Sequence, residues 1–138
     1  MTAAAAAAPS AVVIPKVDSL GTIDEVSKRL DVAGAPPEVK IWPMIETPTA
    51  IFDARQIAAH PRVGVLVMGT NDLAKELRAA QVPGRHGLLP HLATALLAAR
   101  EAGVPLVVGW NCAGVDGVVD WNEWLAGGAT DDPPDEVV

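Results

Sequence analysis

Short apolar segments alternate with amphipathic ones between residues 11 and 109. Four runs rich in Val, Ile and Leu predict buried strands, at residues 11–17, 39–45, 63–68 and 105–108. Apolar residues between these runs recur at three- and four-residue spacing, which predicts helices. Because strands and helices alternate at short connection lengths, the pattern predicts an α/β fold with about four parallel strands and intervening helices.

Capping residues set the expected helix boundaries. Thr22 and Glu25 have capping-box spacing and predict the start of the first helix. Thr47, followed by proline, predicts the start of the second. A short helix is expected over residues 73–80. The clearest helix covers residues 88–102, and the glycine after it, Gly103, is expected to end it.

The segments on either side of residues 11–109 differ from them in composition. Residues 1–10 are rich in alanine and lack a basic stretch, so they predict a disordered tail rather than a signal peptide. Residues 101–138 contain no Lys or Arg, and residues 131–136 are mostly acidic. We therefore expect one domain over residues 11–109, followed by a divergent, disordered acidic tail over residues 110–138.

Composition and charge narrow the class of protein. Half of the 138 residues are apolar, which is enough to build the core of one domain. The net charge of -7, with no basic stripe, argues against binding to nucleic acid or to anionic membranes. No apolar run approaches a membrane span. The single cysteine, Cys112, excludes an intramolecular disulfide and fits a reducing, cytoplasmic location.

Two of the predicted strands end in an acidic residue. Glu46 follows the second strand, and Asp72 follows the third within a Gly-Thr-Asn-Asp turn. The carboxyl ends of parallel strands meet at one edge of a sheet, so both carboxylates are expected to face the same space. Such a pair suits Mg²⁺, which prefers a few carboxylates together with water and ligand oxygens. Alternatively, both are helix N-caps or first-turn acids favoured by the helix dipole.

Other polar residues give weaker indications. Lys16 follows the first strand, where it could hold a carboxylate or phosphate of a substrate, or simply face solvent. The histidines show no metal-ligand spacing, and His60, next to a proline, is expected at the surface end of a helix. Arg85, beside His86 in a glycine-containing loop, could contact an anion.

Four motifs resemble those of a known family. They are Ile14-Pro15-Lys16-Val17-Asp18-Ser19, Met44-Ile45-Glu46-Thr47-Pro48, the segment from Met68 to Leu77, and the segment from Leu97 to Pro105. In this order they resemble the HpcH/HpaI aldolase / citrate lyase beta-subunit family, and most of all its CoA ester lyase branch. The resemblance covers about residues 11–109.

The resemblance implies a fold, a cofactor and a reaction. The expected fold is a partial (β/α)₈ TIM barrel with its site at the C-terminal ends of the strands. By motif match, Glu46 and Asp72 would hold Mg²⁺, and Lys16 is a candidate substrate-binding residue. The expected activity is that of a carbon–carbon lyase, which cleaves acyl-CoA thioesters such as citryl-CoA or malyl-CoA in a retro-aldol step through an enolate.

The chain also departs from the family pattern. A complete (β/α)₈ barrel needs about 250 residues, and the first strand here resembles the family's fourth. The family's substrate-binding arginine lies on an earlier strand, so no catalytic residue is assigned and we expect little lyase activity from the chain alone. The alternatives are a non-catalytic pseudoenzyme that binds metal or CoA, a chain that completes its barrel as a homo-oligomer or with a complementing chain, and a flavodoxin-like binding module.

Overall fold

The computed structural model describes residues 9–80, 82, 85–109, 118–120, 123 and 126. Expectations for residues 1–8, for most of residues 110–138 and for Cys112 lie outside the described residues. None of the described helices has the length and apolar character needed to cross a membrane.

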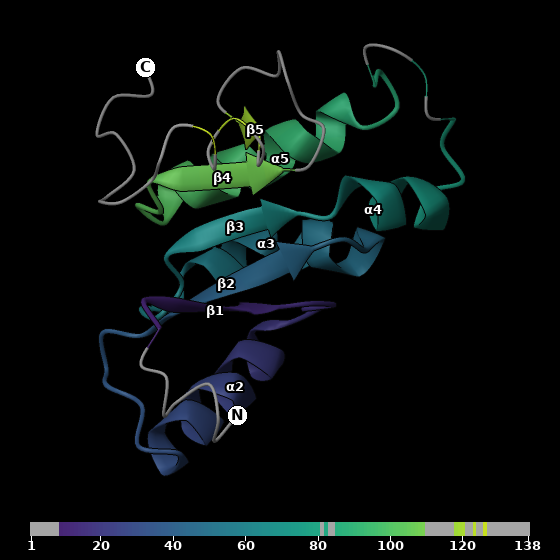
Figure 1. Ribbon diagram of the computed structural model, residues 1–138. Coiled ribbons are helices and arrows are strands. Elements are labelled where there is room, and N and C mark those ends of the chain that lie inside the picture. The colour runs from purple at the N-terminus through teal and green to yellow at the C-terminus, as the bar shows by residue number, and fades with distance from the viewer. Residues whose placement is uncertain are drawn as a thin grey trace.

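The described residues form a five-stranded parallel sheet (Figure 1). The strands lie side by side in chain order, and they are β1 (Ala11–Ile14), β2 (Lys40–Ile45), β3 (Val65–Met68), β4 (Leu106–Gly109) and β5 (Val119–Asp120). The connecting helices are α2 (Leu20–Val32), α3 (Pro48–Ala58), α4 (Thr70–Glu76) and α5 (Leu89–Glu101). The predicted α/β fold with parallel strands is therefore confirmed, and the sheet is open rather than closed into a barrel.

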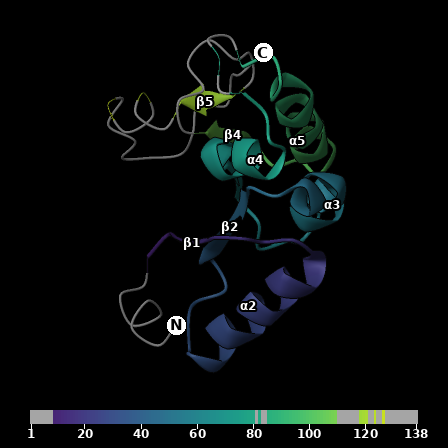
Figure 2. The ribbon, with the colours of Figure 1, turned by 90° about the vertical axis from the view of Figure 1, so that its right-hand side faces the viewer.

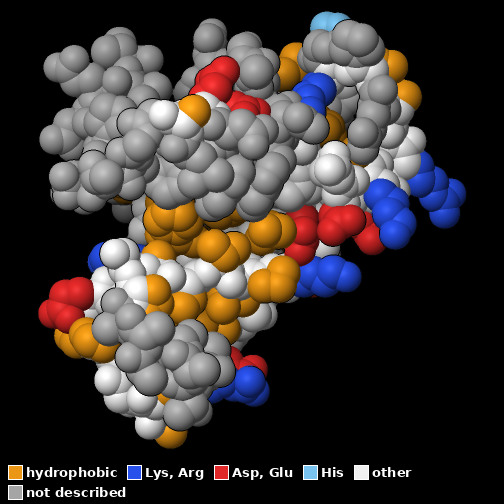
Figure 3. All heavy atoms as spheres, in the orientation of Figure 1, with side chains coloured by type: hydrophobic (Ala, Val, Ile, Leu, Met, Phe, Trp, Pro, Cys, Tyr) orange, Lys and Arg blue, Asp and Glu red, His pale blue; other side chains and the backbone are white. Residues whose placement is uncertain are grey.

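The two faces of the sheet have different environments. Helices α2, α3 and α5 lie on one side, which Figure 2 shows edge-on. The main core lies between them and the sheet, and it includes Ile41, Ile45, Leu66 and Met68. On the opposite face a smaller apolar cluster forms from Val65, Val67 and Val108, with Trp42, Met44 and Val119 packed against them. Hydrophobic side chains are visible along this face over β1, β2 and β3 (Figure 3).

Helix α2 begins earlier than its sequence predicts. The N-cap is Ser19, whose side chain accepts a hydrogen bond from the Thr22 N–H at 3.4 Å, so the prediction of Thr22 as the cap is wrong. Ser19 has the extended backbone that an N-cap requires, with φ -158° and ψ 162°. Glu25 pairs with Arg29 one turn later instead of completing a capping box.

The other predicted helix ends agree more closely with the structure. Thr47 caps α3 and accepts a hydrogen bond from the Ala50 N–H at 3.1 Å. Gly103 follows α5 with φ +72°, the left-handed conformation that glycine adopts readily. Helix α4 starts at Thr70, three residues before the predicted start. Asp72 is therefore in the first turn of α4.

A short strand lies within the segment that was expected to be disordered. Val119–Asp120 pairs in parallel with the last two residues of β4. Val118 and Asp120 are buried, and Val119 packs against the smaller apolar cluster. For residues 118–120, the expectation of a disordered tail is therefore wrong, because two β-branched side chains have apolar surface to cover beside β4.

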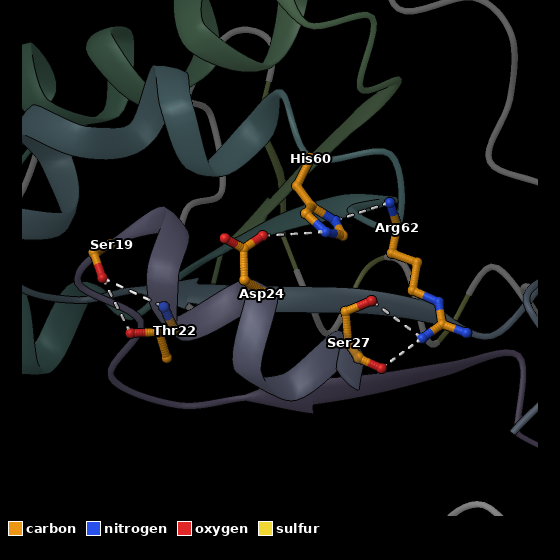
Figure 4. Close-up of polar contacts among 6 residues, drawn as sticks. All are labelled: Ser19, Thr22, Asp24, Ser27, His60 and Arg62. Atoms are coloured by element: carbon orange, nitrogen blue, oxygen red, sulfur yellow. Dashed lines mark hydrogen bonds and ion pairs between the residues drawn. The ribbon is translucent and has the colours of Figure 1, made fainter. Parts of the chain in front are cut away.

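A buried arginine links α2 to the loop that precedes β3 (Figure 4). The Arg62 guanidinium donates to the Ser27 carbonyl at 2.9 Å and to the Ser27 hydroxyl at 3.2 Å. It also donates to the Pro36 carbonyl at 3.5 Å and forms an ion pair with Asp31 at 2.9 Å. One side chain thus connects α2, the loop after it, and the loop between α3 and β3.

His60 belongs to the same network. Its Nδ1 accepts the Arg62 backbone N–H at 3.1 Å, and its Nε2 lies 3.7 Å from the Asp24 carboxylate (Figure 4). The side chain is only 13% exposed. His60 does follow α3, but its expected surface position is wrong because the ring packs between the helix α2 and the Arg62 backbone.

Candidate metal centre

Glu46 and Asp72 line one open pocket of about 400 Å³ at the C-terminal ends of β2 and β3. The other residues that line it are Met44, Gly69, Thr70 and Asn71. The parallel pairing of Ile45 with Met68 brings the two strand ends level. Asp and Glu side chains gather at this end of the sheet, with Lys and Arg side chains close by (Figure 3).

The carboxylate of Glu46 is buried and held in place. Its exposed fraction is 4%. One oxygen, Oε1, accepts the backbone N–H of Lys16 at 2.7 Å. The other oxygen, Oε2, points towards Gly69, where a Cβ would lie only 2.7 Å away. The orientation of Glu46 is thus determined by two segments that are distant in sequence, one following β1 and one following β3.

The next residue, Thr47, joins the same two neighbouring turns. Its hydroxyl caps α3 and also donates a hydrogen bond to the Asp18 carboxylate. The loop between β1 and α2 therefore contacts the end of β2 twice, through the Lys16 amide and through the Asp18 carboxylate. Both contacts are long-range in sequence and tie the loop to the turn that carries Glu46.

Asp72 has a different environment from Glu46. It is exposed and lies in the first turn of α4, where a negative charge interacts favourably with the helix dipole. This position agrees with the alternative interpretation from the sequence, a first-turn acid. It is equally compatible with metal binding, because Asp72 and Glu46 line the same pocket.

Lys16 contributes a backbone group to the pocket's surroundings. Its side chain is exposed, and its φ of +52° is uncommon for a residue with a Cβ. This left-handed conformation accompanies the bond from its N–H to Glu46. Binding of substrate by the Lys16 side chain stays a prediction.

Arg85 also reaches the edge of the pocket. Its Nη1 donates to the Thr70 hydroxyl at 3.2 Å, and Thr70 is 2% exposed and lines the pocket. The sequence indicated an anion-contacting role for Arg85 but not this bond, which joins residues fifteen positions apart. Of the histidines, His86 is exposed and His91 is half-buried, and neither lines the pocket.

The donor set fits a hard divalent cation. Two carboxylates line the pocket, and Asn71 and Thr70 add oxygen atoms around it. Within the described part of the chain, no three His, Cys, Asp or Glu side chains converge to form a full metal cage. Mg²⁺ usually keeps several waters and takes one or two carboxylates. Glu46 and Asp72 thus match the small set of carboxylates that Mg²⁺ usually takes, while a structural zinc site would require more ligands.

A larger pocket lies at the opposite end of the sheet. Its volume is about 500 Å³, and its lining includes Lys40, Trp42, His60 and Gly64. No carboxylate is among the residues that line it. Size alone would favour this pocket, but its chemistry offers nothing to a hard cation, so we place the candidate metal centre at the smaller one.

Comparison with known proteins connects the chain to one family. The sequence model of the HpcH/HpaI aldolase/citrate lyase family matches residues 1–131. A (3S)-malyl-CoA thioesterase of Cereibacter sphaeroides strain ATCC 17025 is 43% identical over 98 residues, which is 71% of this chain and 32% of that protein. A second one, from strain ATCC 17023, is 40% identical over 109 residues, or 79% and 36%. The chain spans about a third of the length of these curated relatives.

Solved structures show the same fold. A citrate lyase from Burkholderia xenovorans LB400 superposes with a TM-score of 0.68 at 16% identity, covering 86% of this chain and 47% of that one. CitE from Mycobacterium tuberculosis, solved in complex with magnesium and acetoacetate, gives a TM-score of 0.62 at 24% identity, covering 78% and 42%. The predicted fold class, an α/β arrangement that forms part of a TIM barrel, is confirmed. The chain belongs to the HpcH/HpaI aldolase/citrate lyase family.

Proposed function

We propose that this chain carries the metal-holding part of a Mg²⁺-dependent site that acts on acyl-CoA thioesters of the malyl-CoA or citryl-CoA class. The observation that carries the proposal is the single pocket that Glu46 and Asp72 share at the C-terminal ends of β2 and β3. Two further observations support it: membership of the family, and the presence of magnesium in the complex of the related CitE fold.

In this proposal the chain's own residues bind and orient the metal. Glu46 provides a buried oxygen whose direction is determined by the Lys16 N–H, and Asp72 provides an exposed oxygen from the first turn of α4. When bound, Mg²⁺ would act as a Lewis acid that polarises a substrate carbonyl and stabilises the negative charge that develops during carbon–carbon cleavage. Arg85, which donates to Thr70 at the pocket's edge, is placed to favour an anionic substrate group.

Thioester hydrolysis is a second candidate reaction. It is favoured by the two relatives at 40–43% identity, both of which are (3S)-malyl-CoA thioesterases. The two reactions break different bonds in the same substrate. Carbon–carbon cleavage releases a 2-oxo acid and a shorter acyl-CoA, whereas hydrolysis adds water across the C–S bond and releases a hydroxy acid and the free CoA thiol.

Metal binding is the primary test, because the matched segment covers only 32–36% of the length of the whole proteins related to this chain. We expect isothermal titration calorimetry to show one Mg²⁺ site in the unmutated chain. Glu46→Gln and Asp72→Asn should each remove it while circular dichroism shows the fold unchanged. Matched controls are Glu38→Gln, an exposed residue before β2, and Asp53→Asn on α3; both should bind Mg²⁺ normally.

Product analysis then separates the two reactions. The chain is incubated with Mg²⁺ and malyl-CoA, and the 2-oxo acid and the free thiol are measured separately. The 2-oxo acid supports the lyase and the thiol supports the thioesterase. Mg²⁺ binding without either product indicates a non-catalytic metal-binding chain. An unmutated chain that binds no Mg²⁺, or a Glu46→Gln variant with full affinity, would contradict the proposed metal site.

A further inference from the structure

Backbone groups from two segments lie against the Glu46 side chain. The Lys16 N–H holds Oε1 at 2.7 Å from the side of β1. On the side of β3, Gly69 lies against Glu46 and is the N-cap of α4. The candidate ligand therefore lies between two backbone segments, one that follows β1 and one that follows β3.

Gly69 has no room for a side chain. A Cβ at this position would lie 2.5 Å from the Glu46 Cβ, 2.7 Å from Glu46 Oε2 and 3.3 Å from the Met44 Cγ. Real Cβ contacts below 3.0 Å are essentially never seen. Its φ of -81° and ψ of 70° lie outside the left-handed region, so the close approach of Glu46, and not the backbone conformation, is what requires glycine here.

The neighbour that a Cβ would meet cannot easily move away. The Glu46 Cβ is the first side-chain atom of a residue that directly follows β2 and precedes the N-cap Thr47. Thr47 is itself bonded to Asp18 and to the Ala50 N–H. Displacing the Glu46 Cβ would require the end of β2 to shift together with these bonds.

We infer that Gly69 and the loop between β1 and α2 are positioning elements for Glu46. Gly69 acts by lacking a side chain, and the loop acts through the Lys16 N–H and the Asp18 carboxylate. The inference rests on the proposed function to the extent that Glu46 is taken as a metal ligand. The geometry that it describes is present without metal, so it has a metal-free test as well.

Strand β3 provides its own control, because a second glycine precedes it. A Cβ on Gly64 would lie 3.2 Å from the Cβ and Cγ of Lys40, an exposed and flexible side chain. At 3.2 Å the adjustment needed is only a few tenths of an ångström, whereas the 2.5 Å approach at Gly69 lies below any contact that real Cβ atoms make. Gly64→Ala therefore makes the same chemical change at the opposite end of the same strand, without touching Glu46.

The experiment compares Gly69→Ala and Gly64→Ala by two measurements. The first is hydrogen exchange of the Lys16 amide by NMR in EDTA, which reports whether Glu46 still accepts that bond. The second is Mg²⁺ affinity by calorimetry. We expect Gly69→Ala to speed exchange at Lys16 and to weaken Mg²⁺ binding by about 10- to 100-fold, the usual effect of losing an outer-shell partner. Gly64→Ala should change the Lys16 exchange rate and the Mg²⁺ affinity by no more than about twofold, because distant sites act independently.

A second pair of variants covers the case in which Gly69→Ala does not fold. Asp18→Asn removes a charge but keeps an oxygen that can accept the Thr47 hydroxyl, whereas Asp18→Ala removes both. We expect faster Lys16 exchange in Asp18→Ala than in Asp18→Asn. Equal exchange in the two variants would show that the loop does not position Glu46.

The outcomes separate the two proposals. Faster Lys16 exchange in Gly69→Ala supports positioning, and with weaker Mg²⁺ binding it supports both. If the unmutated chain binds no Mg²⁺, the proposed function fails, while the exchange result still decides whether Gly69 positions Glu46. Unchanged Lys16 exchange in a folded Gly69→Ala variant overturns the inference.

Discussion

Both ends of the parallel sheet carry polar side chains, and the two sets differ in the partners that they bind. At the N-terminal end, the buried Arg62 and the half-buried His60 direct polar atoms into bonds with Ser27, Pro36 and the Arg62 backbone. At the C-terminal end, Glu46 has one oxygen bonded to Lys16, and its carboxylate shares an open pocket with Asp72. The larger pocket is at the first end and the carboxylate pair at the second.

This difference shows why pocket size is a poor guide to the site in this molecule. The pocket of about 500 Å³ is lined mainly by Ala, Pro, Val and Gly, and its histidine already accepts a backbone N–H. The pocket of about 400 Å³ has two acids within six lining residues. If the second end binds a cation as proposed, mutations at the two ends should affect different measurements, namely stability at the first end and cation affinity at the second.

The largest effect on stability is expected at the N-terminal end. Arg62→Met keeps the aliphatic length but removes the hydrogen bonds to two carbonyls and a hydroxyl of α2 and its following loop. Leaving these part-buried acceptors without their donor costs about 2–4 kcal/mol of unfolding free energy in total. Denaturant unfolding measures this loss.

Calorimetry on the folded Arg62→Met protein provides the complementary measurement. Its Mg²⁺ affinity should match that of the unmutated chain within about twofold, because separated sites act additively. A large loss of Mg²⁺ affinity would show that the two ends of the sheet are energetically coupled and do not act independently.

Removal of metal should have the next largest effect, and only at the C-terminal end. With Mg²⁺ at 100 times its dissociation constant, binding stabilises the folded state by about 2.7 kcal/mol. Adding EDTA should therefore lower the melting temperature of the unmutated chain. The same addition should leave Glu46→Gln unchanged, and an equal EDTA effect on both proteins would place the stabilising metal elsewhere.

Lys16→Gly distinguishes the backbone of Lys16 from its side chain. Glycine adopts φ near +52° without steric cost and keeps the N–H that binds Glu46. We expect unfolding free energy to change by only about 0–1 kcal/mol, since relief of the left-handed strain is offset by the greater entropy of unfolded glycine. Mg²⁺ affinity should be retained. If the Lys16 ammonium binds substrate, the affinity for malyl-CoA should fall while that for Mg²⁺ does not.

The smallest effect is expected on the outer surface, away from both ends. Arg55 on α3 forms an ion pair with Glu101 on α5 at 2.7 Å, and both side chains are largely exposed. Exposed pairs contribute only about 0–1 kcal/mol. Arg55→Ala should thus change the unfolding free energy little and the Mg²⁺ affinity not at all. A loss as large as that in Arg62→Met would mean that helix packing, rather than the sheet ends, controls stability.

The periodicity of the sequence was enough to predict the parts that depend on local patterns. Four of the strands, the cap at Thr47 and the terminating Gly103 follow from short-range rules. The meeting of Glu46 and Asp72 in one pocket follows from the geometry of parallel strands. The cap of α2 was placed wrongly because Ser19 and Thr22 are both good capping residues, and only the entry of the chain into the helix chooses between them.

The remaining features depend on contacts between distant residues. Arg62 gave no signal in the sequence, since a single arginine before a strand is ordinarily exposed, and its partners lie 26 to 35 positions away. Gly69 looked like a turn glycine, while the residue that a side chain there would meet first is Glu46, just after β2. The bond from the Lys16 N–H to Glu46 spans 30 positions. No local pattern encodes such pairs, so they become visible only when the strands are placed side by side.

The most direct test of the central claim is the position of a bound divalent cation. Mn²⁺ shares the oxygen preference of Mg²⁺ and broadens nearby amide signals in ¹H–¹⁵N NMR spectra. In a titration with less than one equivalent of Mn²⁺, we predict that the amides of Lys16, Gly69 and Asp72 broaden first, while those of Gly64 and Gly103 remain sharp. Broadening that begins at Gly64 and Gly103, or that is equal at both ends, would contradict a metal centre formed by Glu46 and Asp72.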